Sequence, residues 1–196
     1  MKNAPETRES VRQLIYVPIV HDSADMGSQA ESMKQVYLEK FGEKAWEESR
    51  RAVAAFWECI EQEINGLELN YARVRLYQDG LPLCGQETKI IADIAKTGSN
   101  NFRILQDLIQ RGAKVEGTED PELLRAEHAL VASGDLGSLE VSQKARELME
   151  KRDLYISQRI DATLEPDETG ILFIGALHNI RSVLPKTIKV HPLIEI

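Results

Sequence analysis

Two short apolar runs near opposite ends of the sequence constrain the fold most. Residues 14–20 read LIYVPIV and residues 171–176 read ILFIGA, and both runs are rich in β-branched or other large apolar residues. Runs of this length and composition are typical of strands that are buried on both faces of a parallel sheet. Helical patterns separate the runs, so the order of elements predicts an α/β protein. We expect a mainly parallel sheet flanked by helices, with a large helical share.

Shorter patterns supply the other expected elements. We expect further strands at about 74–78, 113–117 and 187–191. Apolar spacings and capping residues predict helices at about 28–41, 43–64, 90–98, 102–111, 120–132 and 139–164. Ser28 and Glu31 have the spacing of a capping box, and Gly42 separates the first two helices.

Composition and charge limit the classes of function. The 196 residues fit a single domain over 1–196, with a flexible N-terminus at 1–12. There are 24 Lys and Arg against 32 Asp and Glu, a net charge of −8, and no basic stripe. We therefore expect no nucleic-acid partner. No apolar run approaches the roughly 18 residues of a membrane helix, so no membrane contact is expected. With Cys59 and Cys84 as the only cysteines, a reducing cytoplasm is the expected location.

Potential metal ligands follow several predicted strands. Ligands of open parallel sheets bind outside the carboxyl ends of the strands, where the loops converge. Imidazole and carboxylate groups at these ends suit a divalent ion such as Zn, Mn, Fe or Co, and a metal with an open position activates water. The predicted ligands are His21, Asp79, Glu116 and His178, with Glu119 as an alternative to Glu116.

Each of these residues also has a purely structural interpretation. Asp79 followed by Gly80 is common turn chemistry, and His21 could satisfy backbone groups at a strand end. His178 has the strongest case for function, because Gly175 allows a close approach of the backbone. Arg152 and its neighbour Asp153 lie on a predicted helix. A partly buried arginine there needs a strand-end carboxylate or an anionic substrate, whereas an exposed one forms a surface ion pair.

The pattern formed by four residues near the C-terminal end resembles that of a known family. Arg152 and Asp153 on a helix, followed by Gly175 and His178 after a strand, resemble the TraB/PrgY/GumN group. That group is related to the Tiki metalloproteases and the EreA/ChaN-like proteins. The resemblance implies an EreA/ChaN-like α/β fold with His21 and His178 in one cleft. It implies a metal-dependent hydrolase for the Tiki branch and haem or iron handling for the ChaN branch.

The sequence also departs from that family pattern. Pro18 stands where the family has glycine, and Lys151 stands where it has glutamate. The early acidic residue of the family corresponds to Glu68 or Asp79, and Asp79 is preferred because it ends the clearer strand. Residues 77–119 also resemble part of a prokaryotic family without an assigned activity.

Two hypotheses follow from these residues. The first is a metal-dependent hydrolase acting on a small-molecule or peptide substrate, in which Arg152 holds an anionic group. Its catalytic residues would be His21, Arg152, Asp153 and His178. The second is a non-catalytic ligand-binding or regulatory protein that binds haem or metal. In the second hypothesis the helix at 43–64 forms a partner or homodimer surface, although its apolar face equally fits a core.

Overall fold

A computed structural model describes residues 11–20, 30–132 and 139–194. Within these residues, five strands form one sheet in which all pairings are parallel. The strand order is β3-β2-β4-β1-β5. The strands are β1 (Arg12–Ile19), β2 (Val74–Gln78), β3 (Lys114–Val115), β4 (Thr169–Gly175) and β5 (Ile188–Pro192). The predicted α/β class with a mainly parallel sheet is therefore confirmed.

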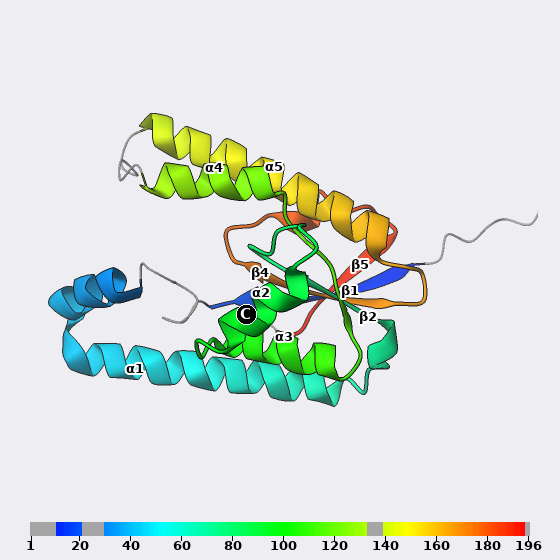
Figure 1. Cartoon of the computed structure of the whole chain (residues 1–196), viewed down its shortest axis with the longest axis horizontal. Helices are drawn as coiled ribbons and strands as arrows, with labels where there is room; N and C mark the ends of the chain where they lie inside the picture. Colours follow the sequence, from blue (N-terminus) through cyan, green and yellow to red (C-terminus); the bar gives the residue numbers. More distant parts are fainter. Residues whose placement is uncertain (1–10, 21–29, 133–138, 195–196) are drawn as a thin grey trace, which may run out of the picture.

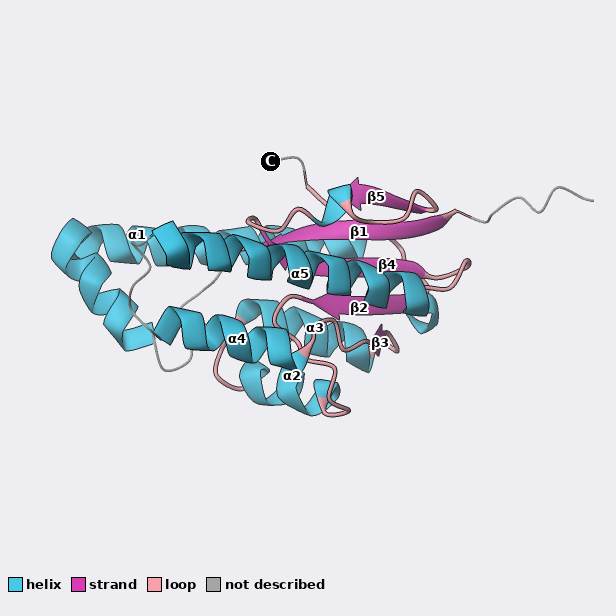
Figure 2. Cartoon of the chain, turned by 90° about the horizontal axis from the view of Figure 1, so that it is seen from above, coloured by secondary structure: helices cyan, strands magenta, loops and turns pink. Residues whose placement is uncertain are grey.

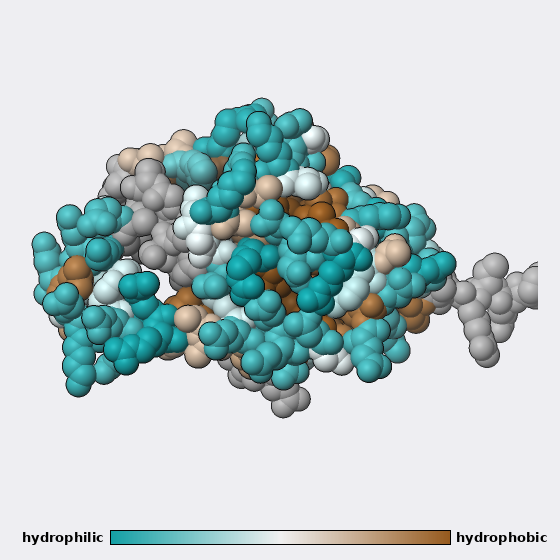
Figure 3. Space-filling view, turned by 60° about the horizontal axis from the view of Figure 1, so that its bottom comes forward, coloured by the Kyte–Doolittle hydropathy of each residue, from teal (hydrophilic) through white to brown (hydrophobic). Residues whose placement is uncertain are grey.

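Helices cover both faces of this sheet (Figures 1 and 2). Their bounds are α1 (Ala30–Gly66), α2 (Glu87–Ala95), α3 (Asn100–Gln110), α4 (Pro121–Ala132) and α5 (Leu139–Thr163). Side chains of α1, α2 and α3 pack in one apolar cluster, and those of α5 pack in another. The face seen in Figure 3 is mostly hydrophilic, with apolar side chains showing in patches between the polar ones.

The alternation of β4 explains why the sheet has two cores. Successive strand side chains point to opposite faces, so Phe173 joins the cluster with α1 while Leu172 and Ile174 join the cluster with α5. All three side chains are fully buried. Burial on both faces accounts for the nearly continuous apolar run that the sequence shows here.

Gly42 interrupts α1 as the sequence predicted. Its φ of 82° and ψ of 169° are not helical, and the helix continues on either side. Glycine populates positive φ without the steric penalty that other residues incur. The capping box predicted at Ser28 and Glu31 stays a prediction, because Ser28 lies outside the described residues.

The apolar face of the second part of α1 belongs to the core. Trp57, Ile60 and Ile64 are fully buried, and the Trp57 indole donates to the carbonyl of Val20 at 3.0 Å. The sequence left this face as either a partner surface or part of the core, and the structure shows that Trp57, Ile60 and Ile64 belong to the core. A homodimer remains a prediction.

The N-terminal part of the chain is described from residue 11 onward. Of the predicted flexible segment 1–12, residues 1–10 lie outside the described residues, whereas Arg12 already belongs to β1 and bonds Asp161. Among the helices that the structure describes, none is long and apolar enough to span a bilayer.

Candidate functional site

Asp79 and His178 meet at the carboxyl edge of the sheet. Asp79 directly follows β2, and His178 lies three residues beyond β4. The register pairs Gln78 with Phe173, so the two strands end side by side. The amide of Gly175 donates to Asp79 Oδ2 at 3.1 Å, and a Cβ at this glycine would already lie 3.1 Å from that oxygen. The close approach expected at Gly175 is therefore to the Asp79 carboxylate.

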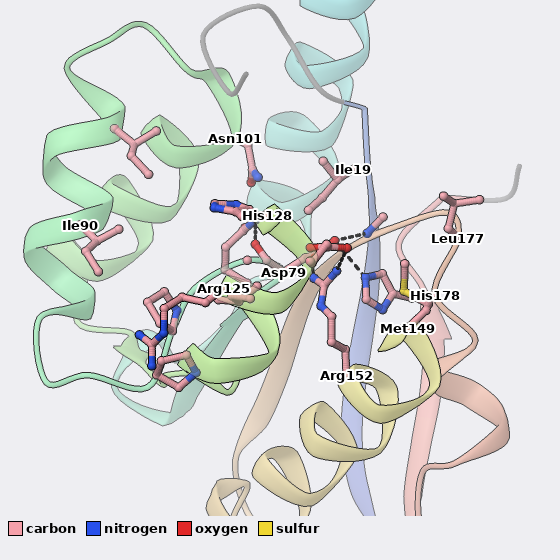
Figure 4. Close-up of a pocket in the computed structure, with 18 of the residues that line it drawn as sticks. Ile19, Asp79, Ile90, Asn101, Arg125, His128, Met149, Arg152, Leu177 and His178 are labelled. Carbon is pink, nitrogen blue, oxygen red and sulfur yellow. Dashed lines mark hydrogen bonds and ion pairs between the residues drawn. The ribbon is translucent and has the colours of Figure 1, made fainter. Parts of the chain in front are cut away.

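Arg152 connects three carboxylates from different parts of the chain. Its side chain is only 4% exposed and extends from α5 toward the strand ends (Figure 4). It donates to both oxygens of Glu119 at 3.0 and 2.6 Å, to Asp79 Oδ1 at 2.7 Å and to Glu127 Oε1 at 2.5 Å. The interpretation of Arg152 as a surface ion pair is therefore wrong. Two of its partners, Asp79 and Glu119, are strand-end carboxylates, and the third, Glu127, lies on α4.

His178 lies between two carboxylates. Its Nδ1 is 2.6 Å from Asp153 Oδ1, and its Nε2 is 3.3 Å from Asp79 Oδ2. The other oxygen of Asp153 accepts from the backbone N–H of Asn179 at 2.8 Å. In the tautomer with the proton on Nδ1, the ring donates to Asp153 and its Nε2 faces Asp79. The Asp153 carboxylate, which is held by the Asn179 amide, thus fixes the orientation of the His178 ring.

The surroundings perturb the ionisation of the cluster. Burial alone would raise the pKa of Asp79, but the hydrogen bond from His178 and the charges of His178 and Arg152 lower the pKa well below its usual range. Burial also opposes protonation of His178, but the contacts with Asp79 and Asp153 raise its pKa above the ordinary value. Burial raises the pKa of Glu119 above its ordinary value, and the hydrogen bonds and charge of Arg152, which lower the pKa, only partly offset this rise.

Negative charge exceeds positive charge in this cluster. Its carboxylates are Asp79, Glu119, Glu127 and Asp153, whereas its cationic groups are Arg152 and, when protonated, His178. With all four carboxylates ionised, the group stays anionic in either protonation state of His178. Such a surplus at a partly buried site favours the binding of a cation.

Asp79, Glu119 and His178 have a geometry that could hold a metal ion. One ligand atom from each lies within 4.8 Å of the others. Imidazole with carboxylates is a donor set of Zn, Mn and Fe sites. Asp153 matches the usual supporting pattern, in which a metal-bound histidine donates its other ring N–H to a carboxylate. These side chains therefore fit a divalent ion.

A cavity of about 970 Å³ opens beside the cluster. Its walls come from the ends of β2 and β4 and from α2, α3, α4 and α5 (Figure 4). The apolar lining includes Ile90, Ile94, Phe102, Leu124, Met149 and Leu177. Polar and charged side chains from α4, among them Arg125 and His128, line it as well. A cleft of this size with both apolar and polar walls is typical of sites for small organic ligands.

The structure places the predicted site residues in different ways. Asp79, Arg152, Asp153 and His178 lie together, whereas His21 lies outside the described residues. Glu116 contacts Arg75 and Arg159 instead of the cluster. The two arginines flank Glu116 from β2 and α5, so its carboxylate is held by them.

Glu119 occupies the place that was assigned to Glu116. After β3 the chain runs beside residues 81–83, and the Leu83 amide donates to the Glu119 carbonyl at 2.8 Å. Gly117 permits this path, because a Cβ there would come within 2.5 Å of the Leu83 Cα. Gly117, the last residue of the predicted strand 113–117, is the sequence signal that could have indicated Glu119.

Comparisons with family models, with curated proteins and with solved structures return no match to this chain. The resemblance to the TraB/PrgY/GumN group therefore stays a prediction, and the site is interpreted from its own geometry.

Proposed function

We propose that this chain is a divalent-metal-dependent hydrolase with Asp79, Glu119 and His178 as its metal ligands. The observation that carries this proposal is the convergence of these three side chains at the carboxyl edge of the sheet, beside an open cavity. A bound divalent ion lowers the pKa of its water and polarises a substrate carbonyl, which is the chemistry that hydrolysis needs.

The charges of the site support this assignment. Glu119 is fully buried, and burial raises its pKa because Arg152 alone does not offset the cost of its charge. A divalent cation would offset that cost. Arg152 in turn holds Asp79 and Glu119 beside each other, because its guanidinium bonds both carboxylates.

His178 and Asp153 would act as a unit. The Nδ1 proton bonds Asp153, which leaves Nε2 as the nitrogen that faces the other two ligands. Metal binding at Nε2 requires the neutral ring, so the ion competes with the proton that Asp79 now favours. Binding therefore releases protons and weakens as the pH falls.

Calorimetric titration of the full chain with Zn²⁺, Mn²⁺ and Co²⁺ tests the proposal. We expect one bound ion per chain for at least one metal, and an affinity at least about 100-fold lower in His178→Ala, because a direct ligand matters more than an outer-shell partner. His191→Ala is the matched control, since His191 lies on β5 and bonds Gln13 instead of the cluster. Absence of binding in the wild type, or equal binding in His178→Ala, would refute the metal site.

The contacts of Arg152 favour a second candidate function. Its guanidinium already occupies one oxygen of Asp79 and both oxygens of Glu119. In this second proposal the charged cluster only shapes the end of the cavity, and the chain binds an organic ligand without turnover. A chain that binds ligands in the cavity but no metal in the same titration would support the second proposal over the first.

A further inference from the structure

Glu127 is a carboxylate of the cluster to which the metal assignment gives no role. It lies on α4, and its side chain lines the cavity together with Asp79 and His178. The Glu127 side chain is 30% exposed, against 14% for Asp79 and 0% for Glu119. Of the three carboxylates that bond Arg152, Glu127 is therefore the most accessible one.

Charge balance at Arg152 does not require Glu127. The single positive charge of Arg152 already has Asp79 and both oxygens of Glu119 as partners. Glu127 adds negative charge to a group that is anionic without it, since Asp153 belongs to the same cluster. Like charges that gather at one cleft are a feature of functional sites, because they adjust the ionisation of the groups that react.

Only one oxygen of Glu127 is engaged by the described part of the chain. Its Oε1 accepts from Arg152 Nη1 at 2.5 Å, and no hydrogen bond from residues 11–20, 30–132 or 139–194 reaches its Oε2. Arg152 Nη2 bonds Asp79 at 2.7 Å and Glu119 at 2.6 Å. One guanidinium group thus sets the Glu127 carboxylate next to two of the proposed metal ligands, with an acceptor left over.

Glu127 is outside the group of side chains that could hold the ion. That group consists of Asp79, Glu119 and His178. A general base has to reach the reacting water, and it keeps its proton acceptor only if the ion does not occupy it. A carboxylate that is close to the ligands, lines the cavity and has an unbonded oxygen meets both conditions.

We propose that Glu127 is the general base of the hydrolase and takes a proton from the attacking water through Oε2. This inference rests on the proposed function, in which the ion held by Asp79, Glu119 and His178 activates that water. As the proton moves to Glu127, the water oxygen forms a bond to the substrate's carbonyl carbon. When the bond from that carbon to the leaving group breaks, the leaving group takes the electron pair and the proton from Glu127. Glu127 is then ionised again.

His128 is the other titratable side chain that α4 places in the cavity wall. No hydrogen bond within the described ranges connects it to Arg152 or to the proposed ligands, whereas Glu127 bonds Arg152 directly. The geometry therefore favours Glu127 as the base, and His128 provides a comparison on the same wall.

Proton release on binding of acetohydroxamic acid tests this role without turnover. The acid chelates a divalent ion as its anion, so it has to lose one proton on binding. The full chain is loaded with the metal that it binds most tightly and titrated calorimetrically at about pH 6, where the displaced water is not ionised. Repeating the titration in buffers of different ionisation enthalpy counts the protons that reach the buffer. We expect almost none from the wild type, because Glu127 keeps the proton, and about one from Glu127→Gln.

Matched variants assign the proton to Glu127. Glu127→Gln keeps the length of the side chain and an oxygen that can accept from Arg152, so the proposed ligands stay in place. Glu122→Gln removes the same charge from the same helix, at a side chain that is 80% exposed and bonds Arg125. His128→Gln removes the other titratable group. Both control variants should release as few protons as the wild type.

The outcomes separate this inference from the metal proposal. Equal release by the wild type and Glu127→Gln, or the same increase in either control, would overturn the general base and leave the metal site intact. If Glu127→Gln does not fold, the wild-type value decides, because a whole proton released shows that no side chain retains it. A loaded chain that does not bind the acid would also overturn the inference, since no position is then open for water. Absence of metal binding would instead refute the proposed function, and the general base with it.

Discussion

Arg152 is the residue on which the candidate site depends most. Its side chain is almost fully buried, and its partners include Glu119, which is completely buried, and Asp79. Burying charges is unfavourable unless each is paired, so removal of one partner leaves the others uncompensated. Arg152 therefore contributes to the fold as well as to the position of the proposed metal ligands.

The substitution Arg152→Met tests this dependence. It keeps much of the side-chain bulk and removes the charge, so we expect the free energy of unfolding to fall by about 3–5 kcal/mol. Chemical denaturation measures the change. Arg51→Met is the control, because Arg51 forms an exposed ion pair with Glu47, and such pairs contribute less than about 1 kcal/mol. Equal effects of the two substitutions would contradict the assigned role.

At the scale of elements, Arg75 connects three neighbouring segments of the sheet. It lies on β2, and its guanidinium contacts Glu116, which follows β3, and Glu168, which precedes β4. The Glu168 side chain is 8% exposed. Burial by itself would raise the pKa of Glu168, but the hydrogen bond from Arg75 and a backbone N–H lower it. The folded state therefore favours the ionised form of Glu168.

This shift predicts an acid-dependent loss of stability. Because the pKa of Glu168 is lower in the folded state, its contribution is present above the unfolded value of about 4.3 and is lost as the pH falls through the folded value. Glu168→Gln should therefore make the free energy of unfolding less dependent on pH below about 5. Denaturation curves at several pH values measure this slope. Glu43→Gln, at an exposed position of α1, should leave it as in the wild type.

Gly117 controls the path by which Glu119 reaches the site. A Cβ at this position would overlap the Cα of Leu83, and backbone atoms cannot move aside easily. We expect Gly117→Ala to destabilise the chain by about 1–3 kcal/mol and to weaken metal binding, because Glu119 is displaced. Gly66→Ala is the control, since a Cβ at Gly66 meets open space. Metal affinity that is unchanged in Gly117→Ala would contradict the assignment of Glu119 as a ligand.

At the scale of the whole molecule, the sheet could be predicted because its central strands carry their own signal. The apolar runs of β1 and β4 record burial on both faces, and strand ends in a parallel sheet share one edge. Asp79 and His178 could be found from that rule alone. Arg152 and Asp153 could be predicted as site residues because they lie on the helix that precedes β4.

Other parts of the site depend on contacts that local patterns do not encode. Glu119 follows a strand of two residues, so the chain direction after β3 is set by packing against residues 81–83. Glu116 was predicted as a ligand because its position next to the strand is visible in the sequence, whereas the attraction of Arg75 and Arg159 is not. That Gln78 Oε1 and Asn101 Oδ1 have no hydrogen-bond partner within the described part of the chain likewise becomes apparent only in three dimensions.

The pairing of β1 has a consequence for synthesis of the protein. Among the described strands, β1 pairs with β4 and β5, and its register joins Gln13 to Thr169, about 150 residues later. At roughly 5–20 residues per second, a ribosome needs about 10–30 s to produce that interval. An apolar strand without its neighbours is prone to aggregate during that time. Of the described strands, β1 is synthesised first but can pair only after β4 has been made, and β4 is the strand that leads to His178.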